Sequence, residues 1–200
     1  PLISNYNHEK FTIYCLSNNS FSDNCTEYLK KKIIFVEIFS MTDKEIAEFI
    51  SKEKIDILID LSGHTANNRL SIFSQNLCPI QISWMGYPNY TGFDSINYRI
   101  VDKFTDPEYT SFGEKEIKLD GFFMCYAAPK DYLIEEPPCI ENKFITFGSL
   151  NNIYKINNIV IEAWSQILIE DENFQFLMKY HGFSDPYVTE NIRKEFLKYG

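Results

Sequence analysis

Strand-like and helix-like runs alternate along this sequence, and that alternation restricts the fold more than any other feature. Strands that alternate with helices build βαβ units, and these form parallel sheets with helices on both faces. We therefore expect an α/β fold with Rossmann-like parallel sheets. The strand-like runs are residues 11–16, 33–39, 55–61, 80–85, 98–101 and 116–119, and the helix-like runs between them are residues 26–32, 42–50 and 67–75.

Two of these runs carry specific local signals. Thr42 followed by Glu45 forms a capping box, and apolar residues at helical spacing come directly after it, which predicts a helix that begins at this point. Residues 55–61 are almost continuously apolar. Such a run is typical of a strand that is buried on both faces of its sheet.

The alternation of strand-like and helix-like runs is interrupted once and then resumes. Residues 127–142 contain several prolines and no clear period, so we expect them to connect two domains. Residues 1–126 then form most of a first Rossmann-like domain. Residues 143–200 hold strands at 144–148 and 174–180, a helix capped by Asn157 or Asn158, and a helix at 188–199. Two βα units are too few for a sheet of ordinary size, so we expect the second domain to be incomplete.

Composition excludes several classes of protein. The 19 basic and 28 acidic residues give a net charge of −9, which disfavours nucleic acid as a partner. No apolar run reaches the roughly 18 residues of a membrane span. Five scattered cysteines without a C-x-x-C pair, and three histidines, indicate reduced thiols in an intracellular protein and no metal site. The first residues, from Pro1, show no signal-peptide pattern, and because they do not begin with Met we expect the natural N-terminus to lie elsewhere.

In parallel sheets, ligands bind beyond the carboxyl ends of the strands, and a first polar cluster follows the most apolar strand. Gly63 permits a tight turn there, and we expect His64 and Thr65 to project over the sheet edge. Asn67 or Asn68 would cap the next helix, whose N-terminal N–H groups favour an anion. The alternative is that His64 and Thr65 only satisfy backbone groups of their own loop.

A second cluster spans residues 84–92. Pro88 and the flanking glycines predict a shaped turn, and Tyr87 and Tyr90 offer aromatic surface for a sugar or a peptide. A packed surface loop is the alternative interpretation.

A third cluster follows the strand at residues 144–148. Asn151, Asn152 and Lys155 combine amide donors with one ammonium group, which suits a phosphate. No Walker loop is present, and a solvated lysine is the alternative. The acids Asp102, Asp106 and Glu114 are spread through loops, where we expect solvation or helix capping and no metal pair.

Several long motifs together resemble one family. Four runs look like the catalytic region of the O-linked N-acetylglucosamine transferase and SPINDLY family, glycosyltransferase family 41. They are DILIDLSGHTANNRL from residue 56, CPIQISWMGYPNYTG from residue 78, NYRIVD from residue 97 and FITFGSLNNIYKI from residue 144. The GHTANN form is more similar to the SPINDLY and bacterial branch than to the animal enzymes.

This resemblance implies a GT-B fold, in which two Rossmann-like domains hold a nucleotide sugar. It implies metal-independent transfer with inversion, and no cofactor, to Ser or Thr hydroxyls of cytoplasmic proteins, or of nuclear proteins in a eukaryote. The implied roles are His64 and Thr65 as catalytic residues near the sugar or its phosphates, Lys155 on the donor diphosphate with Asn151 and Asn152 in the same pocket, and Tyr87 and Pro88 at the acceptor entrance.

Measured against the family, parts of the catalytic region are missing from the sequence. The first strand and an upstream histidine loop would precede Pro1, and a Thr-rich phosphate loop would follow Gly200. We therefore expect both domains to be incomplete, tetratricopeptide repeats elsewhere in the full-length chain, and the isolated chain to be inactive. UDP-N-acetylglucosamine is the favoured donor and GDP-fucose the alternative. A non-catalytic sugar-nucleotide-binding remnant is the other interpretation.

Overall fold

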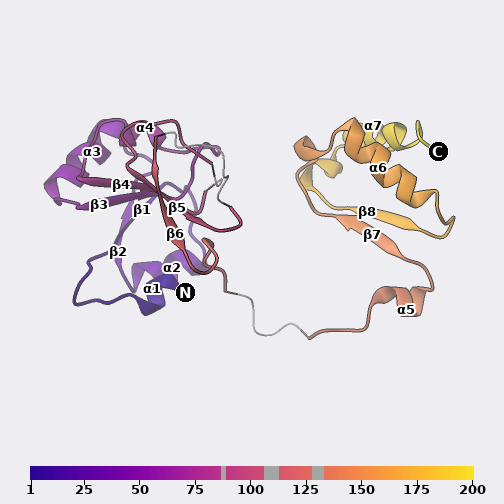
Figure 1. Cartoon of the computed structure of the whole chain (residues 1–200), viewed down its shortest axis with the longest axis horizontal. Coiled ribbons are helices and arrows are strands. Elements are labelled where there is room, and N and C mark those ends of the chain that lie inside the picture. The colour runs from indigo at the N-terminus through magenta and orange to yellow at the C-terminus, as the bar shows by residue number, and fades with distance from the viewer. Residues whose placement is uncertain (87–88, 106–112, 128–132) are drawn as a thin grey trace. The chain divides into compact units, whose positions relative to one another are not determined.

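The computed structural model describes residues 1–86, 89–105, 113–127 and 133–200, which fall into two compact units, Pro1–Ala128 and Pro129–Gly200. In each unit parallel strands alternate with helices (Figure 1), which confirms the predicted α/β class. Among the described residues, no helix has the length and apolar character needed to span a bilayer.

Unit 1 contains two parallel sheets. Strand β1 pairs with β2, and β3, β4, β5 and β6 form a four-stranded sheet in that order. Asp60 at the end of β3 lies opposite Ser83 of β4, which lies opposite Arg99 of β5. The elements are α1 (Leu2–Asn5), β1 (Tyr14–Ser17), α2 (Asn24–Lys30), β2 (Ile34–Glu37), α3 (Asp43–Lys52), β3 (Ile57–Asp60), α4 (Leu70–Phe73), β4 (Ile80–Ser83), β5 (Tyr98–Asp102) and β6 (Lys115–Leu119).

Helix α3 provides the centre of the unit 1 core. Its residues Ile46 and Ile50 are almost completely buried, and the cluster they form packs against Leu16 of β1, Val36 of β2 and Leu58 of β3. One apolar core therefore joins the two sheets.

The predicted capping box at the start of α3 is confirmed. The hydroxyl of Thr42 accepts from the Glu45 N–H at 3.3 Å, and the Glu45 carboxylate accepts from the Thr42 N–H at 2.7 Å. A cap of this kind contributes about 1 kcal/mol.

The prediction that β3 is buried on both faces is wrong. Leu58 packs into the core, whereas Ile57 and Ile59 on the opposite face are 42% and 41% exposed. Within the described residues, Leu58 is the residue of β3 that packs against the buried core clusters, and β3 is the first strand of its sheet. A continuous apolar run therefore does not show how many faces the rest of the molecule covers.

The helix predicted over residues 67–75 is much shorter, since α4 covers only Leu70–Phe73. Asn67 has a φ of 59°, in the left-handed region, which stops a helix from starting there. The Asn68 side chain donates to the Thr65 carbonyl at 2.8 Å and accepts from the Leu70 N–H at 3.1 Å, so it extends the loop up to α4. A four-residue helix provides no anion site at its start, which removes that part of the prediction.

Unit 2 is a parallel two-stranded sheet with helices. Helix α6 begins after Asn157, whose side chain accepts from the Val160 N–H at 3.0 Å, as predicted. Trp164 of α6 contacts Phe176 of β8 and Phe196 of α7, so α6 and α7 cover one face of the sheet (Figure 1). The elements are α5 (Pro138–Asn142), β7 (Thr146–Ser149), the 3-10 turn η1 (Ile153–Lys155), α6 (Asn158–Leu168), β8 (Gln175–Met178), the 3-10 turn η2 (His181–Ser184) and α7 (Pro186–Phe196).

Candidate functional site

The turn after β3 is built on a buried carboxylate. Asp60 is 6% exposed, and its side chain accepts from the Gly63 N–H at 2.7 Å and from the Ser62 N–H at 3.3 Å. Gly63 has a φ of 57°, which a glycine adopts at little cost. The chain therefore turns sharply at the carboxyl end of β3 and presents His64 and Thr65 next.

His64 is fixed by a contact with a distant loop. Its Nε2 lies 2.6 Å from the carbonyl oxygen of Thr91, and its ring stacks on that of Phe93 with centroids 6.4 Å apart. A carbonyl oxygen only accepts hydrogen bonds, so Nε2 carries the proton in this contact. In the neutral imidazole, Nδ1 is then the acceptor.

Thr91 is in turn held by Glu114. One carboxylate oxygen of Glu114 accepts from the Thr91 N–H at 2.8 Å and also from the Thr91 hydroxyl. Thr91 and Glu114 are 4% and 5% exposed. The sequence predicted a solvated or capping acid at Glu114, which is wrong, because the loop that contains Thr91 covers this carboxylate.

The same correction applies to Asp102, at the end of β5. It is almost completely buried and accepts from the N–H groups of Phe104, Thr105 and Phe123. The hydrogen bond from Phe123, followed by those from Phe104 and Thr105, holds the pKa of Asp102 below its usual range. Asp102 therefore ties two loops to the strand end, while Asp106 lies outside the described residues.

The first two predicted clusters meet at Gly86. A Cβ added to this glycine would lie 2.9 Å from the backbone nitrogen of Gly63 and from the carbonyl carbon of Ser62. The loop after β4 therefore packs directly on the turn after β3. Tyr87 and Pro88, which we predicted at the acceptor entrance, lie outside the described residues.

Thr65 closes its own turn. The Thr65 hydroxyl donates to the Ser62 carbonyl at 3.0 Å. Thr65 and His64 are both exposed. Thr65 thus binds a backbone carbonyl of its own loop, as the alternative interpretation expected, whereas His64 binds a carbonyl of a different loop. Their exposure still leaves other polar atoms of this turn open to a ligand.

Tyr90 has a different environment from the one predicted. Its ring lies 4.2 Å from the guanidinium carbon of Arg99, and its hydroxyl donates to Glu116 at 3.2 Å. The ring therefore packs on a buried cation, a contact that fits the alternative interpretation of a packed surface loop.

The third predicted cluster belongs to unit 2, at the end of β7. Asn152 caps η1 by accepting from the Tyr154 N–H at 3.1 Å, and Asn151 is exposed. Lys155 is the last residue of η1 and is exposed. No carboxylate within the described ranges forms an ion pair with its ammonium group, which leaves this cation available to an anionic ligand.

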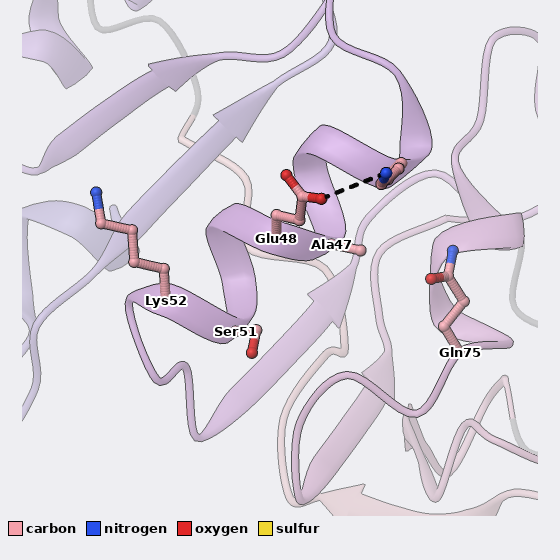
Figure 2. A pocket seen from close by; sticks show the side chains of 6 residues that line it. Ala47, Glu48, Ser51, Lys52 and Gln75 are labelled. Carbon is pink, nitrogen blue, oxygen red and sulfur yellow. Dashed lines mark ion pairs between the residues drawn. The ribbon is translucent and has the colours of Figure 1, made fainter.

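A surface hollow lies apart from these clusters, between the outer face of α3 and the segment after α4 (Figure 2). It contains no predicted site residue, and its charges partly cancel because Lys44 pairs with Glu48 at 3.9 Å. The residues around it are Lys44, Ala47, Glu48, Ser51, Lys52 and Gln75.

Comparison with known proteins agrees with the motif resemblance. The sequence profile of glycosyl transferase family 41 matches residues 2–125. A probable UDP-N-acetylglucosamine–peptide N-acetylglucosaminyltransferase SPINDLY from Eustoma exaltatum subsp. russellianum is 40% identical over 172 residues, which are 84% of this chain and 18% of that protein. The corresponding protein SEC from Arabidopsis thaliana is 30% identical over 177 residues, or 82% of this chain and 18% of its own length.

A solved structure is similar as well. A mutant of the Thermobaculum terrenum O-GlcNAc transferase superposes with a TM-score of 0.88 and 25% identity, over 99% of this chain and 38% of that one. The chain therefore spans less than a fifth of the two plant relatives and less than half of this solved structure.

Proposed function

Because this chain belongs to glycosyltransferase family 41, we propose that it is an internal part of a protein O-glycosyltransferase. The reaction would move a sugar from a nucleotide-sugar donor to Ser or Thr hydroxyls of other proteins. The observation that carries this proposal is the family match over residues 2–125 together with the exposed His64–Thr65 turn at a strand end.

N-acetylglucosamine is the sugar that we propose first. The names of the two plant relatives and of the solved structure all refer to transfer of this sugar. GDP-fucose is the alternative donor, because the GHTANN motif resembles the SPINDLY branch.

The chemistry that we assign to Lys155 is charge stabilisation. In sugar transfer the leaving nucleoside diphosphate gains negative charge in the transition state, and an ammonium aimed at it does the work of a metal ion. Lys155 supports this role because it is exposed and has no ion pair in the described part of the chain. Asn151 and Asn152 would add polar contacts to the same phosphates.

His64 and Thr65 would act on the sugar side. The His64–Thr91 hydrogen bond leaves Nδ1 of a neutral ring as an acceptor for a hydroxyl group. Tyr87 and Pro88 keep the acceptor-side role that the resemblance implies. The transfer would be inverting and independent of metal, and would take place in the cytoplasm or nucleus.

We further propose that residues 1–200 alone are inactive and that the full-length protein carries tetratricopeptide repeats. The test is an assay of the full-length protein with an acceptor peptide and either UDP-N-acetylglucosamine or GDP-fucose, read by the mass added to the peptide. Addition of one N-acetylhexosamine or of one deoxyhexose identifies the donor. If neither donor leads to modification of a panel of Ser/Thr peptides or of cellular protein, the proposal that the protein is an enzyme is contradicted. The alternative, a non-catalytic protein that binds sugar nucleotides, then remains.

A further inference from the structure

Glu114 is a buried carboxylate whose hydrogen bonds, among the described residues, all come from one residue. It precedes β6 and is 5% exposed, and one of its oxygens accepts both the N–H and the hydroxyl of Thr91. Its other oxygen is buried without a hydrogen-bond partner in the described residues. Burying a carboxylate with half of its acceptor capacity unused costs free energy, so loop stability alone is a poor reason for an acid at this position.

The residue that Glu114 holds is the one that binds His64. The Thr91 carbonyl accepts from His64 Nε2 at 2.6 Å, and the ring rests on Phe93 two residues further along the same loop. A hydrogen-bonded path thus runs from a buried acid through a rigidly held Thr to the exposed imidazole that follows β3.

We propose that Glu114 is a positioning residue for His64. By holding Thr91 through two hydrogen bonds, it fixes the direction of the Thr91 carbonyl. That carbonyl keeps the imidazole proton on Nε2 and sets the plane of the ring, so that Nδ1 is presented as the acceptor for a substrate hydroxyl. The catalytic meaning of this arrangement rests on the proposed function, whereas the arrangement itself does not.

The Nε2–H proton of His64 gives a direct readout on this chain. With only three histidines, at positions 8, 64 and 181, its nitrogen-bound proton can be assigned by NMR through loss of the signal in His64→Gln. We expect a slowly exchanging proton in the unmodified chain, and exchange with water at least about tenfold faster in Glu114→Ala, because a loosened carbonyl protects less well. Glu114→Gln keeps an acceptor oxygen for Thr91 and should retain most of the protection.

The matched control is Asp102→Asn, which alters another buried carboxylate that holds different loops. It should leave the His64 proton unchanged. If Glu114→Ala does not fold, Thr91→Val removes only one of the two bonds to Glu114, and several-fold faster exchange is expected. Unchanged exchange in a folded Glu114→Ala or Thr91→Val chain overturns the proposal.

The activity of the full-length protein provides a second test of the positioning role. Glu114→Ala should lower kcat by about tenfold or more with little change in the donor KM, the size expected for loss of an orienting partner. In His64→Gln, adding Glu114→Ala should cause no further loss, because the acid acts through the histidine. If the loss of kcat in the double variant equals the product of the losses in the two single variants, the positioning role is overturned. Absence of transfer by the unmodified enzyme contradicts only the proposed function, since the proton exchange is measured without donor.

Discussion

Arg99 and Glu116 form an ion pair between two adjacent strands, with Nη2 of the arginine 2.6 Å from Oε1 of the glutamate. Arg99 is 2% exposed, and the Tyr90 ring lies against its guanidinium. A cation this deeply buried depends on its partner, because removal of the partner leaves an uncompensated charge in a medium of low polarity.

Glu116→Ala should therefore lower the free energy of unfolding by about 3 kcal/mol or more, measured by urea denaturation. The control is Glu190→Ala, which breaks an exposed pair with Lys194 at 3.9 Å and should cost less than about 1 kcal/mol. If the two variants lose the same free energy of unfolding, burial of Arg99 does not determine how much its ion pair contributes to stability.

Gly86→Ala tests the contact between the two loops of the candidate site. Its methyl group would meet the backbone of residues 62–63 at 2.9 Å, and backbone cannot rotate away as a flexible side chain can. We expect a loss of about 1–3 kcal/mol in unfolding free energy and a change in the NMR signals of His64. The control is Gly121→Ala, where no atom lies within 4 Å of the added carbon. It should have much smaller effects on the unfolding free energy and on the NMR signals of His64.

Lys155→Ala in the full-length enzyme tests the phosphate role. Loss of one preorganised charge from the transition state should lower kcat by about a hundredfold or more. Lys155→Arg keeps the charge and should recover part of the rate. Lys194→Ala removes an exposed lysine of α7 and should leave the rate within about twofold of that of the unmodified enzyme, because surface substitutions away from a site have small effects. Undiminished transfer by Lys155→Ala excludes the assigned role.

Asp102 predicts a specific dependence of stability on pH. Its pKa is lowered in the folded state by hydrogen bonds from Phe123, Phe104 and Thr105. The stability it contributes is therefore fully present above the unfolded value of about 3.9 and is lost as the pH falls through the lower, folded value.

Asp102→Asn should be less stable than the unmodified chain at pH 7, and the gap should narrow as the pH falls below about 4. Urea midpoints between pH 7 and pH 2.5 measure this. A gap that stays constant over that range would mean that the asparagine acts by packing alone.

Local signals in the sequence were reliable for single elements. The Thr42–Glu45 box and the Asn157 cap need only a few neighbouring residues, and the structure confirms both. The burial of Ile57 and Ile59 was mispredicted because it depends on which elements cover the second face of the sheet, and no residue near them in sequence specifies that.

The candidate site shows the same division. Composition around residue 64 predicted a turn with an exposed histidine, and the turn is present. The partners of that histidine were missed because Thr91 lies 27 residues away and Glu114 a further 23, beyond the reach of any local pattern. Asp60 is the one missed residue with a local signal, since it is an acid three positions before the glycine whose N–H it accepts.

The unpaired edge of β3 has a consequence for handling the chain. In a parallel pair, alternate residues point their N–H and C=O groups to opposite neighbours, and among the described strands β3 pairs with β4 only. A strand edge in this state, flanked by the exposed side chains of Ile57 and Ile59, is a template for the addition of another strand. We therefore expect self-association of the isolated chain to increase with its concentration, since each molecule offers its neighbours an unpaired strand edge.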